Sequence, residues 1–203
     1  KKLANNQKRS VMFYVHGGGY VVGTIFSTFS DGQYIARGGD VIVVSVNYRL
    51  GPFGFLYGGD VKGNMGLKDM ILGLKWVQEN ITHFGGDPNE VTLFGTSAGS
   101  MAVGSLVLTP LTKGLFKRAI LLGAAPNSLM GGISKQESLE LTKKLATKLN
   151  CPVDEIQASV DCLRAKPMQE LANSVTLSFA DNNFLFQSMV MMIRFIQFHL
   201  PKH

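Results

Sequence analysis

The stretch VTLFGTSAGSM, residues 91–101, constrains the fold of this chain more than any other feature. Its apolar start favours a buried strand, and the small residues after Ser97 favour a helix that packs closely against a sheet. Only a few residues remain for the turn between them, so the chain must reverse sharply. Gly95 and Gly99 leave room where a Cβ would clash in such a turn. We expect Ser97 at its tip, with an exposed hydroxyl above the helix N-terminus.

The segments around this turn alternate between strand and helix patterns. Residues 10–19 form a β-rich run that ends in glycines, and residues 41–49 are apolar on both faces, as in a strand covered on both sides. Residues 64–84 have helical spacing and end at two glycines. Their apolar stripe comprises Leu67, Ile71, Leu74 and Val77. With residues 91–94 and 116–123 as further strands, the order predicts an α/β fold with a mainly parallel central sheet flanked by helices.

The chain after residue 130 has the pattern of amphipathic helices. Residues 135–150 form the first, Asp154 is predicted to cap the second, and Lys166-Pro167 begins a third. The residues expected to face inward are Leu139, Leu145 and Leu149 in the first helix, and Ile156, Val160 and Leu163 in the second.

Composition and charge argue against two classes of partner, nucleic acids and the membrane interior. With 45% hydrophobic and 17% charged residues the chain is globular in type. Its net charge is +6, but the lysines and arginines are scattered and no aromatic residues interleave with them, which argues against nucleic acid. The apolar residues 184–200 are interrupted by Gln187, Arg194 and Gln197, and are too short and broken to predict an integral membrane span.

A second glycine motif, His16-Gly17-Gly18-Gly19, follows the first predicted strand. In isolation it could be a flexible turn. Upstream of an exposed serine in a sharp turn it suggests an oxyanion hole, because consecutive glycine amides offer N–H groups whose positions are fixed before reaction. We therefore predict that this loop lies beside Ser97.

Several long blocks resemble the type-B carboxylesterase and cholinesterase family of the α/β-hydrolase fold. They are VMFYVHGGGYVVG, GDVIVVSVNYRLGPFGFL, GNMGLKDMILGLKWVQENITHFGGDPNEVTLFGTSAG and LTKGLFKRAILLG. The resemblance covers residues 10–125 and continues more weakly to about 186. Hormone-sensitive-lipase relatives share the glycine loop and the turn serine, but not NYRLGPFGFL or FGGDPNEVTLFG. The resemblance implies a partial α/β-hydrolase domain over residues 1–187, with N- and C-terminal parts missing.

The resemblance also assigns roles to individual positions. Ser97 is similar to the family nucleophile, and Gly18, Gly19 and Ala98 are similar to its three oxyanion-hole amides. It implies hydrolysis of a small-molecule carboxylic ester through an acyl-enzyme, with no metal or organic cofactor and with no indication of oligomeric state. The alternative is a non-catalytic adhesion or scaffold protein, because the same family includes neuroligin-like members.

Other positions match the family or depart from it. Arg49 and Asp69 match a buried ion pair beneath the active-site gorge, and Trp76 matches a packing tryptophan expected in the core. Thr96 stands where the family usually has Glu, which removes a carboxylate near the site and should weaken attraction for cationic substrates. Residues 122–124, Leu-Gly-Ala, stand where the family usually has Gln-Ser-Gly.

The base and the acid that a serine nucleophile needs are not evident in this sequence. In α/β-hydrolases they follow the serine in the order acid, then histidine, and only His199 and His203 follow Ser97. The acids between are on predicted helix surfaces: Glu137, Glu140, Asp154, Glu155, Asp161 and Glu170. In the family both partners come much later, so we expect them beyond this chain, and the chain alone should be nearly inactive.

The last residues lose the family pattern abruptly. After about residue 187 the sequence SMVMMIRFIQFHLPKH no longer resembles it. A reading frame shifted by one nucleotide would allow Pro-Val-Asp-Gly-Asp-Asp over residues 186–192, close to the family sequence. We interpret residues 188–203 as a non-native tail from a frameshift or mis-splicing.

Two features bear on the cellular compartment. Cys151 and Cys162 match a small disulfide loop of the family, the alternative being two free buried thiols. Asn80-Ile81-Thr82 is an N-glycosylation sequon at a predicted helix end. Together they favour the secretory pathway, in the ER lumen or outside the cell.

Overall fold

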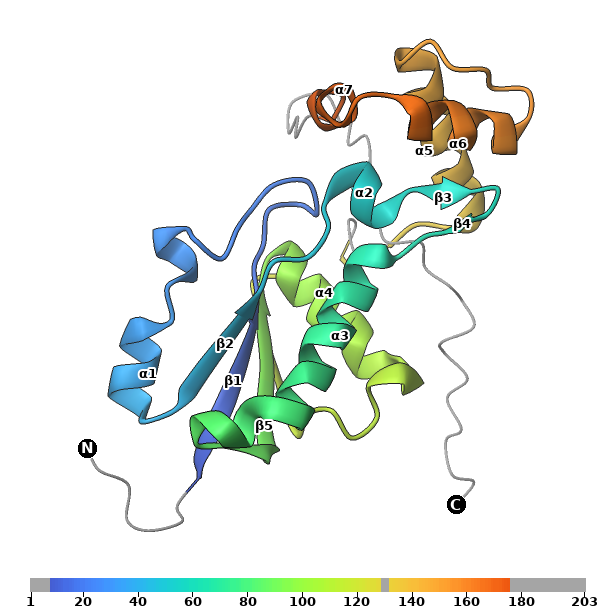
Figure 1. The fold of residues 1–203 in the computed structure, drawn as a ribbon. Helices are drawn as coiled ribbons and strands as arrows, with labels where there is room; N and C mark the ends of the chain where they lie inside the picture. Colours follow the sequence, from blue (N-terminus) through green and yellow to red (C-terminus); the bar gives the residue numbers. More distant parts are fainter. Residues whose placement is uncertain (1–7, 129–131, 176–203) are drawn as a thin grey trace, which may run out of the picture.

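A computed structural model describes residues 8–128 and 132–175, and a four-stranded parallel sheet lies at its centre (Figure 1). The strands run in the order β2-β1-β5-β6, and every neighbouring pair is parallel. Their bounds are Arg9–Val15 for β1, Ile42–Val46 for β2, Gly86–Thr96 for β5 and Arg118–Leu122 for β6. All four predicted strands are present, which confirms the α/β class.

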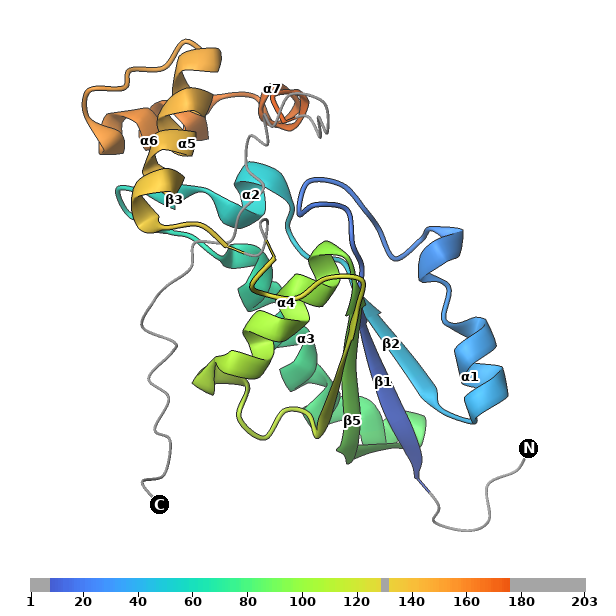
Figure 2. The same ribbon diagram turned by 180° about the vertical axis from the view of Figure 1, so that it is seen from behind.

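Helices cover the two faces of this sheet (Figures 1 and 2). Helices α3 (Met65–Asn80) and α4 (Ala98–Leu108) lie on one face, and α1 (Gln33–Gly39) lies beside β2 on the other. The side chains of β2 alternate between the same two faces: Val46 points toward α3, and Val43 faces Gly32, just before α1. Short 3-10 turns are η1 (Thr28–Ser30), η2 (Ile81–Phe84) and η3 (Pro110–Thr112).

The main core lies between the sheet and α3 and α4. Alternate residues of the central strands, among them Phe13 and Leu93, are fully buried and pair in register. In α3 the predicted stripe is confirmed, with Ile71, Leu74 and Val77 buried and Leu67 partly buried. The helix ends through η2 at Gly85, whose φ of 80° gives the left-handed cap that the two glycines predicted.

Trp76 does not belong to this core, so the expectation for it was wrong. Its side chain is 43% exposed on the outer face of α3, where the ring packs against Phe84 at 5.7 Å between centroids. The physical reason is the position of Trp76 around the helix. It follows the buried Leu74 by two residues, which turns its side chain about 200° away from that of Leu74.

The edges of the sheet are less covered than the sequence suggested. β2 was expected to be covered on both faces, but each of its five residues is only half-buried because it is an edge strand. β6 is the other edge, and its apolar side chains Ile120, Leu121 and Leu122 are exposed. An exposed apolar edge of this kind favours association between molecules.

The described residues 132–175 form a helical region beyond the carboxyl ends of the strands (Figure 1). It consists of α5 (Lys135–Lys148), α6 (Ile156–Ala165) and α7 (Met168–Asn173), which lie near α2 (Gly51–Phe55) and the hairpin of β3 (Tyr57–Gly58) and β4 (Val61–Lys62). Its own cluster of buried residues comprises Leu56, Leu145, Ala146, Cys151 and Leu163. Leu139, Leu149 and Ile156 are half-buried, and Val160 is buried as predicted.

Two details of these helices concern their N-terminal caps. α5 begins with a capping box, in which Ser134 and Glu137 bond reciprocally to each other's backbone N–H groups. Asp154 is not the cap of α6, contrary to expectation. Glu155 occupies that position without a side-chain bond, so α6 starts one residue later than predicted.

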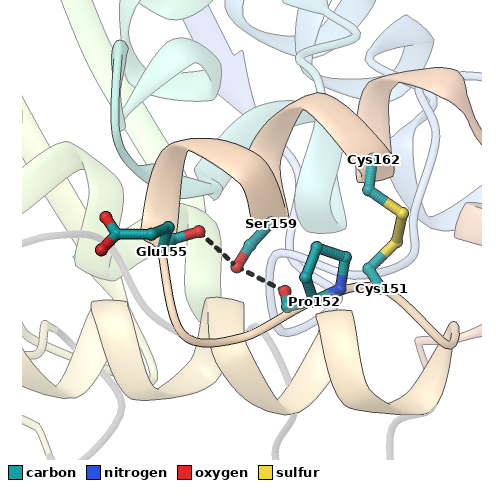
Figure 3. Close-up of a disulfide and its surroundings, with 5 residues drawn as sticks. All are labelled: Cys151, Pro152, Glu155, Ser159 and Cys162. Carbon is teal, nitrogen blue, oxygen red and sulfur yellow. Dashed lines mark hydrogen bonds between the residues drawn. A yellow bond between two sulfur atoms is a disulfide. The ribbon is translucent and has the colours of Figure 1, made fainter.

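The disulfide between Cys151 and Cys162 is present, as the family resemblance implied (Figure 3). Their Cα atoms are 5.8 Å apart, because the chain runs outward through Pro152 and returns along α6. The Ser159 hydroxyl closes this loop, with its oxygen 2.7 Å from the carbonyl oxygen of Pro152 and 3.2 Å from that of Glu155.

Residues 188–203, interpreted above as a non-native tail, lie outside the described residues. Within 8–128 and 132–175, no helix combines the length and the apolar character that crossing a membrane requires.

Candidate active site

Ser97 occupies the sharp turn between β5 and α4, in a backbone conformation that side chains rarely adopt. Its φ of 55° and ψ of −122° are uncommon for a residue other than glycine and cost about 1–3 kcal/mol. Two backbone bonds hold it there: the Ser97 N–H donates to the Leu122 oxygen at 3.0 Å, and its carbonyl accepts from the Met101 N–H at 3.1 Å. The Ser97 residue itself is exposed. This is the geometry expected for an exposed turn serine.

The glycines on both sides of Ser97 are required by close backbone approach. A Cβ added to Gly95 would lie 2.5 Å from the Gly99 oxygen. A Cβ on Gly99 would lie 2.7 Å from the His16 oxygen and closer still to that of Val15. Neither neighbour is a flexible side-chain end, so a larger residue would force the turn apart.

The triple-glycine loop lies directly against this turn. A Cβ on Gly17 would be 2.7 Å from the Thr96 oxygen and 3.1 Å from the Ser97 Cβ. Gly18 and Gly19 have φ values of 115° and 60°, which suit glycine, and the Gly18 oxygen accepts from two later amides of the same loop. The structure therefore brings the two motifs together, although they are about 80 residues apart in the sequence.

Three amides at this junction have no acceptor in the part of the chain that the structure describes. Among the described residues, the N–H groups of Gly18, Gly19 and Ala98 donate to no backbone or side-chain oxygen. For Ala98 this is usual, because it opens α4 and the first amides of a helix have no partner within it. For two consecutive loop glycines it is less usual, and it leaves donors ready for an external acceptor.

A stacked pair of rings supports the start of the loop. His16 is almost fully buried, its ring stacks on Tyr48 at 4.4 Å, and the Tyr48 hydroxyl donates to the His16 oxygen at 2.8 Å. The His16 Nδ1 lies 2.8 Å from the Gly17 oxygen, which can only accept, so this nitrogen carries the proton. Burial lowers the pKa of His16, against a smaller opposing effect of that carbonyl. No pattern in the sequence indicates that Tyr48 serves the loop.

Arg49 and Asp69 form the expected ion pair, but not the expected burial. The carboxylate accepts from Nε at 2.8 Å, Nη2 at 2.7 Å and the backbone N–H at 3.0 Å of Arg49. The Arg49 side chain is 54% exposed and that of Asp69 is 23% exposed, so the pair lies at the surface. Burial raises the pKa of Asp69, but the bonds from Arg49 outweigh it and bring that pKa below its usual value.

The comparisons with known proteins identify the family of the chain. A profile described as the Carboxylesterase family matches residues 1–200. The chain belongs to the carboxylesterase family. It is 44% identical to acetylcholinesterase of Danio rerio over 168 residues, 81% of this chain and 26% of that protein. It is 42% identical to neuroligin-2 of Homo sapiens over 168 residues, 82% of this chain and 20% of that protein.

A third relative matches a longer part of the chain. Carboxylesterase 3B of Mus musculus is 41% identical over 189 residues, 91% of this chain and 32% of that protein. The chain spans a third or less of the length of these three relatives. The parallel sheet flanked by helices is accordingly part of the α/β-hydrolase fold of the carboxylesterase family.

Both departures from the usual carboxylesterase sequence lie at the turn. Thr96 is exposed beside Ser97 and brings no charge. The Leu122 oxygen holds the Ser97 amide, and the Ser100 hydroxyl donates to the Ala124 oxygen at 2.5 Å. The Leu-Gly-Ala segment therefore contacts the turn mainly through its backbone, which explains how it can replace Gln-Ser-Gly without displacing Ser97.

The described part of the chain does not bring a base to Ser97. No hydrogen bond joins Ser97 to a histidine or a carboxylate within residues 8–128 and 132–175. The six acids between the turn and residue 175 are exposed, as predicted, and His199 and His203 lie outside the described residues. Within the same ranges no three acidic, histidine or cysteine side chains gather in a way that could hold a metal ion.

Proposed function

We propose that Ser97 is the nucleophile of a serine carboxylic-ester hydrolase. The observation that supports this most is a strained, exposed serine in a chain of the carboxylesterase family, beside three amides that have no acceptor among the described residues. Strain in a non-glycine residue persists only where the surrounding structure holds it, and it is frequent at active sites. Ser97 would attack the carbonyl carbon of a small-molecule ester, and the amides of Gly18, Gly19 and Ala98 would stabilise the oxyanion.

The rest of the reaction needs groups outside the described residues. A histidine, oriented by a carboxylate, would take the Ser97 proton and deliver it to the leaving alcohol, leaving an acyl-enzyme that water then cleaves. Without that base the hydroxyl is an ordinary alcohol, and the rate falls by several orders of magnitude. We therefore expect residues 1–203 alone to be nearly inactive.

Thr96 bears on the substrate. A glutamate before the nucleophile would place a negative charge within a few ångströms of the bound ester, where a cation is attracted strongly. With Thr96 that attraction is missing, so we propose a preference for neutral over cationic esters. Thr96→Glu should lower the KM for a choline ester and leave that for a neutral ester of the same acyl group unchanged.

The alternative function is a non-catalytic neuroligin-like adhesion or scaffold role. The similarity to neuroligin-2 supports it, and the two sequence departures at the turn leave it open. A fluorophosphonate probe on the longest form encoded by the natural transcript separates the two. Labelling that disappears in Ser97→Ala supports the hydrolase, and absence of labelling in the unaltered protein supports the adhesion role.

We also propose that the protein matures in the secretory pathway. The Cys151–Cys162 disulfide supports this, because such bonds persist in oxidising compartments. When the chain is fused to a secretory leader, the protein in the medium should show no free thiol before reduction and two after it. The same chain made in a reducing cytosol should give two free thiols.

A further inference from the structure

An exposed apolar stripe runs along the outer face of α3 into η2, separate from the candidate active site. Leu72, Trp76 and Phe84 are 67%, 43% and 62% exposed, and the two rings are in contact. Leu72, Trp76 and Asn80 recur every four positions in α3, a spacing that places helical side chains on one face, and Phe84 joins them from η2 through its contact with Trp76. We call Leu72, Trp76 and Phe84 the outer stripe. Three large apolar side chains together on a surface indicate that something covers them.

Asn80 lies beside the outer stripe, between Trp76 and Phe84 in the sequence, and is the acceptor of a glycosylation sequon. Asn80-Ile81-Thr82 is the only Asn-x-Ser/Thr sequence in the 203 residues. The Asn80 Nδ2 donates to the Trp76 oxygen at 3.0 Å, so the amide is fixed one turn from the tryptophan. Ile81 is buried, while Thr82, whose hydroxyl completes the sequon, is exposed.

The side-chain amide of Asn80 can be bonded and modified at once. Its nitrogen carries two hydrogens, and the bond to Trp76 uses one. An N-linked sugar replaces a single hydrogen and leaves the other able to donate. A glycan added here would therefore begin beside Trp76 without breaking the hydrogen bond that positions Asn80.

We propose that Asn80 carries an N-linked glycan whose first sugars cover Trp76 and Phe84. In the modification the Nδ2 attacks the anomeric carbon of a lipid-linked oligosaccharide diphosphate. One N–H bond and the carbon–oxygen bond to the diphosphate break, a nitrogen–carbon bond forms, and the lipid diphosphate leaves with the proton. This inference rests on the proposed secretory maturation and not on any role of Ser97.

A sugar suits this surface better than water or a charged partner does. The C–H groups on one face of a pyranose carry partial positive charge, and the faces of aromatic rings carry partial negative charge. The opposite face of the sugar presents hydroxyls to solvent. Lys75 and Glu79 are exposed on the same helix and have opposite signs, so the surroundings do not select a strongly charged partner.

The modification itself can be tested without relying on the final fold. The chain behind a secretory leader is translated with microsomes and compared with Thr82→Ala, which removes the sequon but keeps Asn80. Digestion with a glycoamidase in heavy-oxygen water should mark Asn80 as labelled aspartate in more than half of the translocated chains. No label at Asn80, or equal mobility of the two chains before digestion, would overturn the proposal.

The covering of the outer stripe is tested through Trp76, the only tryptophan of the chain. The secreted protein, with its glycan trimmed to one N-acetylglucosamine, is compared with Thr82→Ala by acrylamide quenching of tryptophan fluorescence. We expect the quenching constant to be at least twofold lower in the sugar-bearing protein. Phe84→Ala, which removes one of the two rings, should reduce that difference.

Other coverings give different results. Equal quenching constants that are both high would show that the sugar points away from the rings. Equal constants that are both low would show that protein covers Trp76, and sedimentation would reveal whether it is a second copy. Either result contradicts the proposal, and neither bears on the nucleophile, because Ser97 and activity play no part in the measurement.

Discussion

The turn around Ser97 and the helical region of α5–α7 are held together in different ways. At the turn the contacts join backbone to backbone: Gly17, Gly95 and Gly99 each touch a main-chain oxygen that an added Cβ would meet. In the helical region the contacts join side chains, through the Cys151–Cys162 disulfide and the bonds of Arg164 to Asp60 and Asp161. The first region should therefore tolerate no added atom, whereas the second should tolerate surface changes but depend on its covalent link.

Gly99→Ala should have the largest effect. The added methyl group would meet the backbone oxygens of Val15 and His16, which cannot move without shifting β1, so we expect a loss of about 3 kcal/mol or more in the free energy of unfolding. Gly38→Ala in α1 is the matched control, because nothing lies within 4 Å of its Cβ position, and it should stabilise by about 0.5–1 kcal/mol. Urea denaturation measures both. Equal effects would mean that the turn is not crowded.

Loss of the disulfide should be the next largest effect. Replacing Cys151 and Cys162 together by Ala releases a loop with a sequence separation of 11, which should lower the free energy of unfolding by about 2–3 kcal/mol. The helices α5 and α6 should lose amide protection first, since their cluster is small. Hydrogen exchange can establish this order. If β1 and β5 open earlier than α6, the two regions are not independent in the way described.

Asp69→Asn tests the Arg49–Asp69 ion pair, and its effect on stability should be smaller than that of losing the disulfide. At pH 7 it should lower the free energy of unfolding by about 1–2 kcal/mol, because the carboxylate accepts three bonds from Arg49. The pKa of Asp69 in the folded protein lies below its unfolded value of about 3.9, so the contribution is complete above about pH 4. It should disappear as the pH falls through the lower folded value. Denaturation between pH 2 and 7 measures it, and a difference that stays constant would contradict the assignment.

Ser97→Gly should show the smallest effect on stability, but a specific one. Glycine adopts a φ of 55° without strain, so Ser97→Gly should be more stable than Ser97→Ala by about 1 kcal/mol or somewhat more. Both variants lack the hydroxyl, so its loss does not contribute to the difference in stability between them. Thermal unfolding of the pair is the measurement. Equal stabilities would mean that the turn is relaxed and that its geometry gives no support to a functional role.

The sequence predicted the elements of the fold that depend on residues close together in the chain. A strand, a turn between two glycines and a helix of small residues could be assigned for residues 91–108 because each step depends on near neighbours. Contacts between distant residues could not be found in this way where no motif marks both partners. The bond from Tyr48 to His16 joins residues 32 apart, and that from Ser100 to Ala124 joins residues 24 apart, without any pattern in the intervening sequence.

The two errors about surface exposure have a common cause. Trp76 and the Arg49–Asp69 pair were expected to be buried because they match family positions, not because of their own spacing. The helical phase of α3 places Trp76 away from Leu74 and Val77, and the structure follows the phase. A match to a family position predicts which residues meet, as it did for Arg49 and Asp69, more securely than it predicts what covers them.

The central claim is that the Ser97 oxygen faces the free amides of Gly18, Gly19 and Ala98. The most direct test is a nitrogen–proton correlation spectrum of the longest natural form, recorded before and after reaction with a fluorophosphonate. The account predicts that these three amide protons, and few others, move downfield as they bond to the phosphonyl oxygen on Ser97. An adduct on Ser97 that leaves the three resonances in place would contradict it.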